Sequence, residues 1–177
     1  MSTNKWVIDP THSEIQFKVK HLMISTVTGY FKKFHLEAST EGDDFSTVHD
    51  VVFTIDTASV DTNNAQRDEH LKSEDFFNSE AHAQIVFTGT AYQPEVDGEG
   101  QLTGNLSIRG VAKPIVVNIE FGGMVVDPYG QTKAGFTVSG KINRKEFGLT
   151  WGALTEAGNV VVADEVRFHA ELQLIKQ

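Results

Sequence analysis

The sequence predicts an all-β fold, an up-and-down antiparallel barrel of about eight strands within one domain, residues 1–177. Apolar and polar residues alternate over long runs, which is the period of a strand with one buried face. Short sequences rich in Gly, Asp and Pro separate these runs, as in hairpin turns. Closing such strands into a barrel removes the free sheet edges, although a two-sheet sandwich is an alternative for the same pattern.

The alternating runs predict the strands in chain order. The second run changes phase across Lys32 and Lys33, and a β-bulge within one strand accounts for that change. The predicted strands cover residues 15–19, 27–38, 51–55, 85–91, 102–108, 115–121, 134–142 and 166–174.

The segments between the strands predict turns and little helix. Residues 41–44, 97–100 and 127–130 carry the Gly, Asp and Pro of hairpin turns. Residues 63–72 break the alternation and predict a short helix, because Asn63 can cap it, Gln66 follows three positions later, and good helix formers follow. A single helical turn is a further expectation for residues 21–24.

Composition limits the class of protein. With 40% apolar and 22% charged residues, the 177-residue chain has ordinary globular usage and can bury a substantial core. Its formal charge of −9 argues against a nucleic-acid partner. The chain has no cysteine, which excludes disulfides and thiolate sites.

The given sequence shows no targeting or membrane segment. Its first residues lack the basic head and apolar stretch of a secretory signal, which predicts a cytoplasmic protein, or a periplasmic one if a signal peptide has been removed. No run approaches the roughly 18 apolar residues of a membrane-spanning helix, so no integral membrane segment is expected.

Small residues recur on the apolar faces of the predicted strands, for example Gly29, Gly89, Gly104 and Gly140. Glycine weakens a strand interior, so its repeated use indicates that something else needs the space. A bound ligand is one explanation. Bending of strands at barrel corners is the other, and the pattern leaves both open.

Several segments resemble the YceI-like family of polyisoprenoid-binding, lipocalin-like barrel proteins. The resemblance covers nearly the whole chain, through residues 6–17, 19–22, 29–31, 61–62, 67–77, 104–111, 113–114 and 143–151. The block Arg67-Asp-Glu-His-Leu-Lys-Ser-Glu-Asp-Phe-Phe77 is the most distinctive. The resemblance implies an elongated barrel with an apolar pore for an isoprenoid chain such as a quinone or polyprenyl tail.

The residues expected to line such a pore are apolar. Four polar residues, His21, Arg67, His70 and Arg144, are candidates for its rim, where an arginine could contact an anionic head group. Structural anchoring is the alternative for each. The candidate lining residues are Phe17, Val19, Phe31, Phe53, Ile55, Phe76, Phe77, Phe87, Gly104, Leu106, Ile108, Phe136, Val138, Gly140, Phe147, Leu149, Trp151 and Phe168.

The function expected from these observations is lipid binding, for transport, storage or a stress response. No nucleophile elbow, phosphate loop or metal-ligand spacing is present, so no catalytic residue, metal or cofactor is predicted beyond the apolar ligand. The alternatives are an enzyme that acts on an isoprenoid lipid and a filled barrel with a stress-response or interaction role. The expected partner is the isoprenoid lipid, and a homodimer is compatible with the sequence.

Overall fold

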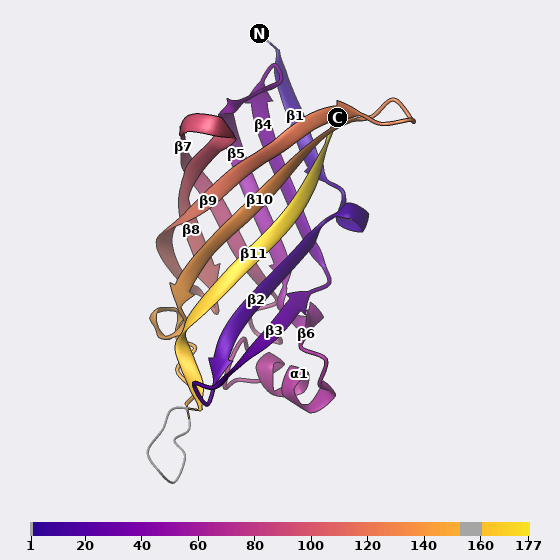
Figure 1. Ribbon diagram of the computed structural model, residues 1–177. Coiled ribbons are helices and arrows are strands. Elements are labelled where there is room, and N and C mark those ends of the chain that lie inside the picture. The colour runs from indigo at the N-terminus through magenta and orange to yellow at the C-terminus, as the bar shows by residue number, and fades with distance from the viewer. Residues whose placement is uncertain (1, 153–160) are drawn as a thin grey trace.

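The chain folds into a closed antiparallel β-barrel (Figure 1). The computed structural model describes residues 2–152 and 161–177. Within these ranges eight strands pair in the order β1-β4-β5-β7-β8-β9-β10-β11, and β11 pairs again with β1, which confirms the predicted barrel. The barrel strands are β1 (Thr3–Ile8), β4 (Phe34–Glu41), β5 (Asp44–Asp56), β7 (Gln84–Pro94), β8 (Glu99–Ile108), β9 (Val111–Val126), β10 (Thr132–Asn143) and β11 (Val162–Lys176).

Three further strands extend the sheet beside β11: β2 (Glu14–His21), β3 (Ser25–Phe31) and β6 (Val60–Asp61). The helical segments are η1 (Pro10–His12), η2 (Thr57–Ser59), α1 (Ala65–Lys72), η3 (Val96–Gly98) and η4 (Arg144–Phe147). None of the helices in the described part of the chain has the length and apolar character that crossing a membrane requires.

The two ends of the barrel differ. The three predicted turns at residues 41–44, 97–100 and 127–130 join β4 to β5, β7 to β8 and β9 to β10, and they meet at what we call the hairpin end. The β2–β3 hairpin, α1 and η4 lie at the opposite end, which we call the α1 end (Figure 1). At about 3.3 Å per residue and a tilt near 40°, the 15 residues of β11 make the barrel roughly 40 Å long.

Alternation places the apolar residues inside. In β8 every second residue from Gly100 to Ile108 is buried, whereas the residues between them are exposed or half-buried. At the hairpin end Trp6 is fully buried, and its indole Nε1 donates a 2.9 Å hydrogen bond to Thr40 Oγ1. The sequence pattern did not predict β1, because Val7 interrupts the alternation between Trp6 and Ile8.

The short segment between β1 and β2, residues 9–13, is a joint that lets β11 pair with both of these strands. β1 pairs with residues 174–176 of β11 and β2 with residues 162–171, and η1 lies between them. Asp9 caps η1: its carboxylate accepts from Thr11 N at 3.0 Å and from His12 Nδ1 at 2.8 Å. Ser13 Oγ donates to Asp9 O and accepts from Gln173 N, which fixes the joint to β11.

The predicted single strand over residues 27–38 is wrong. The chain leaves the sheet at Lys32 and Lys33, where Lys32 N donates to Ser59 O and Lys33 O accepts from Asp56 N. β3 therefore pairs with β2 and β6, whereas β4 pairs with β1 and β5. The phase change in the sequence marks a break between two strands and not a bulge.

The predicted helix at residues 63–72 is confirmed as α1, which begins at Ala65. Its cap is Asn64, whose side chain accepts from Arg67 N at 3.0 Å. The helical turn expected at residues 21–24 is wrong. Leu22 and Met23 have left-handed backbones, with φ of 52° and 58°, so the segment forms the tight β2–β3 hairpin.

Candidate ligand cavity

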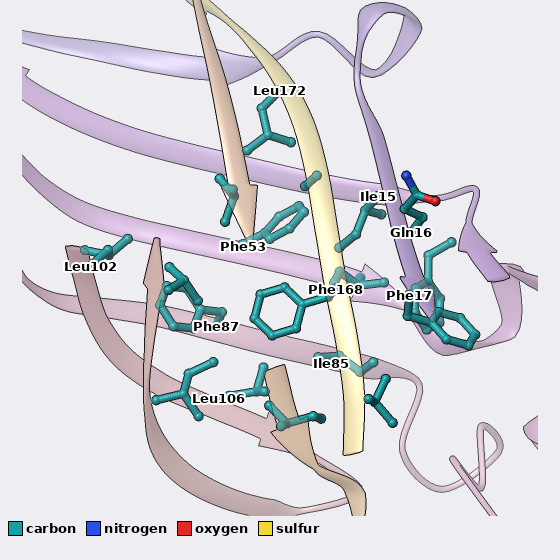
Figure 2. A pocket seen from close by; sticks show the side chains of 18 of the residues that line it. Ile15, Gln16, Phe17, Phe53, Ile85, Phe87, Leu102, Leu106, Phe168 and Leu172 are labelled. Atoms are coloured by element: carbon teal, nitrogen blue, oxygen red, sulfur yellow. The ribbon is translucent and has the colours of Figure 1, made fainter. Parts of the chain in front are cut away.

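The described part of the barrel holds an elongated cavity of about 650 Å³ between its two ends. Every barrel strand except β1 contributes lining side chains, and most of these are apolar. In Figure 2 the rings of Phe53, Phe87 and Phe168 lie around this space with Leu102 and Leu106 from β8. Its size lies within the 300–1,000 Å³ that is usual for small-molecule sites.

Most of the predicted lining residues do line the cavity. Whether they contact a ligand stays a prediction. These residues are Phe17, Val19, Phe31, Phe53, Ile55, Phe76, Phe77, Phe87, Leu106, Ile108, Phe136, Val138, Leu149, Trp151 and Phe168.

The other three predicted lining residues, Gly104, Gly140 and Phe147, are not in the cavity wall. Aromatic rings occupy the space in front of the two glycines. A Cβ atom at Gly104 or Gly140 would lie 2.5 Å from Cζ of Phe87 or Phe168, respectively. Phe147 is buried in η4, with 1% of its surface exposed. The glycines therefore make room for rings of the protein itself.

An aromatic cluster narrows the cavity at the hairpin end. Phe45 packs against Phe136, with ring centroids 4.8 Å apart, and against Trp6 at 4.7 Å. Phe121 lies 5.3 Å from Phe136 and completes the cluster. The sequence pattern does not mark Phe45 as a lining residue, because the left-handed residue Asp50 and two register shifts break the alternation of β5.

Near this cluster the hydroxyl of Tyr92 is partly desolvated. Burial raises the pKa of Tyr92, and the nearby carboxylate of Glu95 raises it further. Both residues line the cavity. This phenol is therefore a neutral hydrogen-bonding group at physiological pH.

α1 brings two of the predicted polar residues to the opposite end. Arg67 donates from Nε to Thr62 Oγ1 at 2.8 Å and from Nη2 to Thr62 O at 2.6 Å. His70 Nε2 lies 2.8 Å from the carboxylate of Asp75, and its ring packs edge-on against Trp151 at 4.9 Å. Both side chains line the cavity, as does His21 at the end of β2.

Arg144 also lines the cavity, and its contacts are those of a structural anchor, which was the alternative to a head-group role. Its side chain is buried, with 3% of the residue exposed. The guanidinium donates to Leu149 O and Trp151 O at 2.6 Å and to Ala163 O at 2.9 Å. Desolvation lowers the pKa of Arg144 from its ordinary value. Arg144 therefore anchors the segment after η4 to β11.

Comparison with known proteins identifies the family. A family model for the YceI-like domain matches residues 6–174. The chain belongs to the YceI-like family. A UPF0312 protein of Staphylococcus epidermidis is 37% identical over 170 residues, which cover 96% of each chain.

Solved structures share the YceI-like barrel. The crystal structure of BcnA from Burkholderia cenocepacia has a TM-score of 0.81 at 23% identity, covering 94% of this chain and 98% of BcnA. A polyisoprenoid binding domain from Saccharophagus degradans, implicated in plant cell wall breakdown, has a TM-score of 0.66 at 15% identity over 97% of this chain and 98% of that domain. At these identities the likeness shows a common fold.

Proposed function

We propose that this YceI-like protein binds a long isoprenoid lipid inside its barrel and acts as a carrier or store for it. The observation that carries the proposal is the elongated apolar cavity of about 650 Å³. Burying an apolar tail there contributes about 25 cal/mol per Å², less the cost of ordering a flexible chain. The shared fold of the polyisoprenoid binding domain from Saccharophagus degradans supports an isoprenoid tail, such as that of a quinone or polyprenyl lipid.

The placement of titratable groups favours binding over catalysis. Among the described residues that line the cavity, the titratable side chains lie near its two ends, and aliphatic and phenyl side chains dominate the stretch between them. Acid–base chemistry needs a proton carrier within hydrogen-bond reach of the reacting atom. An apolar wall suits a tail that must be held and released unchanged.

Native mass spectrometry of the purified protein, followed by organic extraction, tests the proposal. We expect an apolar molecule of isoprenoid type to accompany the wild-type protein. Val138→Trp should lose it, because Val138 lines the cavity and an indole would obstruct it. Ser139→Trp is the matched control, since Ser139 is the next residue of β10 and is not among the lining residues.

The same preparation, stripped of lipid, should take up added geranylgeraniol. A wild-type protein that carries no apolar molecule and takes up no geranylgeraniol would overturn the proposal. Equal uptake by Val138→Trp and the wild type would show that the lipid binds outside the cavity.

A further inference from the structure

The turn between β2 and β3, residues 22–24, exposes two large apolar side chains at the α1 end (Figure 1). Met23 has 58% of its surface exposed to solvent, and Ile24 has 82%. The turn is fixed to the segment before β11, because Leu22 N donates to Val161 O at 2.7 Å. The protein therefore presents Met23 and Ile24 to solvent from a hydrogen-bonded backbone.

The cavity lining reaches the β2–β3 turn from both sides. His21 directly precedes the turn and Val27 lies three residues after Ile24, and both line the cavity. The side chains of Met23 and Ile24 themselves lie outside the lining. The exposed apolar turn is therefore continuous with the wall of the cavity.

The sheet has a free edge beside the same turn. β3 pairs with β2 over residues 25–30, whereas on its other side it pairs with β6 only at Tyr30 and Phe31. Within the described chain, residues 25–29 of β3 therefore lack a strand partner on that side. Side chains of α1, among them Leu71, line the cavity at this end in place of a further strand. Because no backbone ladder closes this part of the described wall, a lipid tail can pass here most easily.

The hairpin of β2 and β3 is cationic within an acidic protein. The chain has 24 acidic and 15 basic side chains, yet residues 15–36 contain four lysines and no carboxylate. Lys18 and Lys20 of β2 are exposed, and neither forms an ion pair with the described part of the chain. The charge of these lysines is therefore available to an anionic surface.

The carboxylates of the neighbouring elements fall into two groups. On β11, which pairs with β2, Asp164 lies 3.3 Å from Lys145 Nζ. Glu165 lies 3.2 Å from Arg167 Nε, so both carboxylates have cations of their own. Residues 65–75, which include α1, hold four carboxylates and two permanent cations, and an anionic surface would repel them. The hairpin, and not the helix, is therefore the cationic contact that the α1 end offers.

We propose that the α1 end docks on an anionic phospholipid bilayer through the β2–β3 turn, with Met23 and Ile24 inserted among the lipids and the lysines of β2 facing the charged surface. This inference rests on the proposed lipid binding and names the partner with which the lipid is exchanged. Apolar side chains gain by leaving water at the interface, and each nearby lysine adds attraction to an anionic leaflet. Contact at this end spares the isoprenoid tail a passage through water, where its apolar surface is costly.

Vesicle flotation tests the docking surface. Lipid-free protein is mixed with vesicles of phosphatidylcholine and phosphatidylglycerol, or with vesicles of phosphatidylcholine alone. We expect the wild type to bind the mixed vesicles more tightly than the neutral ones, since one lysine beside an anionic surface is worth roughly fivefold in affinity. High salt should remove most of this difference, because Lys18 and Lys20 are exposed.

Replacing the apolar side chains of the turn should weaken docking. M23S/I24S should bind the mixed vesicles roughly tenfold more weakly than the wild type, because two large apolar side chains no longer leave water. The matched control V125S/V126S removes two apolar side chains of β9 at the hairpin end, which are 65% and 67% exposed, and it should bind as the wild type does. Thermal unfolding checks each fold. If M23S/I24S unfolds, I24S replaces it, and a several-fold loss of vesicle binding is expected.

Transfer of geranylgeraniol from loaded protein to the mixed vesicles tests exchange by contact. The transfer rate should rise with vesicle concentration, because an encounter with the bilayer limits it. M23S/I24S should transfer the alcohol more slowly and still bind it, since neither residue lines the cavity. A rate that does not depend on vesicle concentration would show passage through water and would overturn exchange by contact.

The outcomes separate this inference from the proposed function. A wild type that takes up geranylgeraniol but binds neither kind of vesicle overturns the docking and leaves lipid binding in place. Equal vesicle binding by folded M23S/I24S and the wild type, or an equal loss in V125S/V126S, overturns the assignment to the turn. Dimers of the wild type that M23S/I24S loses, without vesicle binding, would assign the turn to a second copy of the chain and overturn the docking. A wild type that takes up no geranylgeraniol overturns the proposed function and the exchange of lipid, whereas flotation still decides whether the turn docks.

Discussion

At the scale of single residues, the glycines of the barrel wall make room for aromatic rings. A Cβ at Gly140 would lie 2.5 Å from the Phe168 ring, and a Cβ at Gly29 would overlap the Phe17 ring. The sequence showed small and large residues on the same faces, but only the cross-strand register decides which ring covers which glycine. The glycines therefore do not create the cavity, because aromatic rings of the protein fill the space in front of them.

We predict that Gly140→Val lowers the free energy of unfolding by about 1–3 kcal/mol, because Phe168 must leave its place in a packed wall. Urea unfolding measures this. Gly135→Ala on the same strand is the control, since a Cβ there meets nothing within 4 Å, and it should be neutral or slightly stabilising. A similar loss of unfolding free energy in both variants would contradict the explanation that Gly140 makes room for the Phe168 ring.

Arg144 gives a second prediction at this scale. Arg144→Met should lower the free energy of unfolding by about 2–4 kcal/mol, because it leaves the carbonyls of Leu149, Trp151 and Ala163 without their donor. Lys145→Met, which removes an exposed cation beside Asp164, should cost under about 1 kcal/mol. Chemical denaturation of both variants checks this, and a fully stable Arg144→Met would show that the anchor is dispensable.

At the scale of elements, local signals predicted some features and tertiary contacts decided the others. The helix α1 follows from Asn64 and the residues after it, which act within one turn. The break at Lys32 and Lys33 depends on hydrogen bonds to η2, more than twenty residues away, so no local pattern shows it. Leu22 and Met23 look helical by composition, yet the strands on either side impose a left-handed hairpin.

Some features of the candidate site also follow from local sequence patterns, and others depend on tertiary contacts. The apolar lining follows from alternation, and most of its residues were predicted from the sequence. The burial of Arg144 was not, because its acceptors lie on the segment after η4 and on β11, and these meet only in the folded chain. The gathering of titratable lining side chains near the two ends of the cavity likewise needs the topology, since His21 and Glu95 are far apart in the sequence.

The joint between β1 and β2 gives a prediction about pH. Hydrogen bonds from the Thr11 hydroxyl, and then from His12, the Thr11 amide and Lys133, hold the pKa of Asp9 well below its ordinary value. A carboxyl with a lower pKa in the folded state stabilises the fold fully above its unfolded pKa of about 3.9. This contribution is lost as the pH falls through the folded pKa.

Asp9→Asn should therefore be less stable than the wild type at pH 7, and the difference should shrink below about pH 4. Urea unfolding between pH 7 and pH 3 measures the difference. Asp97→Asn, on an exposed turn residue, should match the wild type at pH 7. A difference between Asp9→Asn and the wild type that stays constant down to pH 3 would show that the charge of Asp9 does not matter.

At the scale of the whole molecule, the length of the barrel limits the ligand. In the proposed complex the tail lies along a cavity in a barrel roughly 40 Å long, and the rings of Phe45, Phe121 and Phe136 line the cavity at the hairpin end. Each buried CH₂ adds about 0.8 kcal/mol before the cost of ordering the tail. Selection by tail length should therefore be gradual up to the length of the cavity.

We predict that affinity rises with each isoprene unit in a series of isoprenoid alcohols until the tail fills the cavity, and then levels off. Calorimetric titration of lipid-free protein with the series measures this. Phe45→Ala should move the plateau to longer tails, because it opens the hairpin end. Affinity that does not depend on tail length would place binding at a mouth of the barrel.

The ring and glycine pairs should also constrain which substitutions evolution accepts. A mutation that enlarges Gly29, Gly104 or Gly140 is tolerated only if the facing ring of Phe17, Phe87 or Phe168 shrinks at the same time. The two members of each pair should therefore covary across YceI-like sequences, and some relatives should carry the ring and the glycine exchanged between strands. Such exchanges would keep the wall volume and move the position of a ring, so each lineage could reshape its cavity by coupled substitutions.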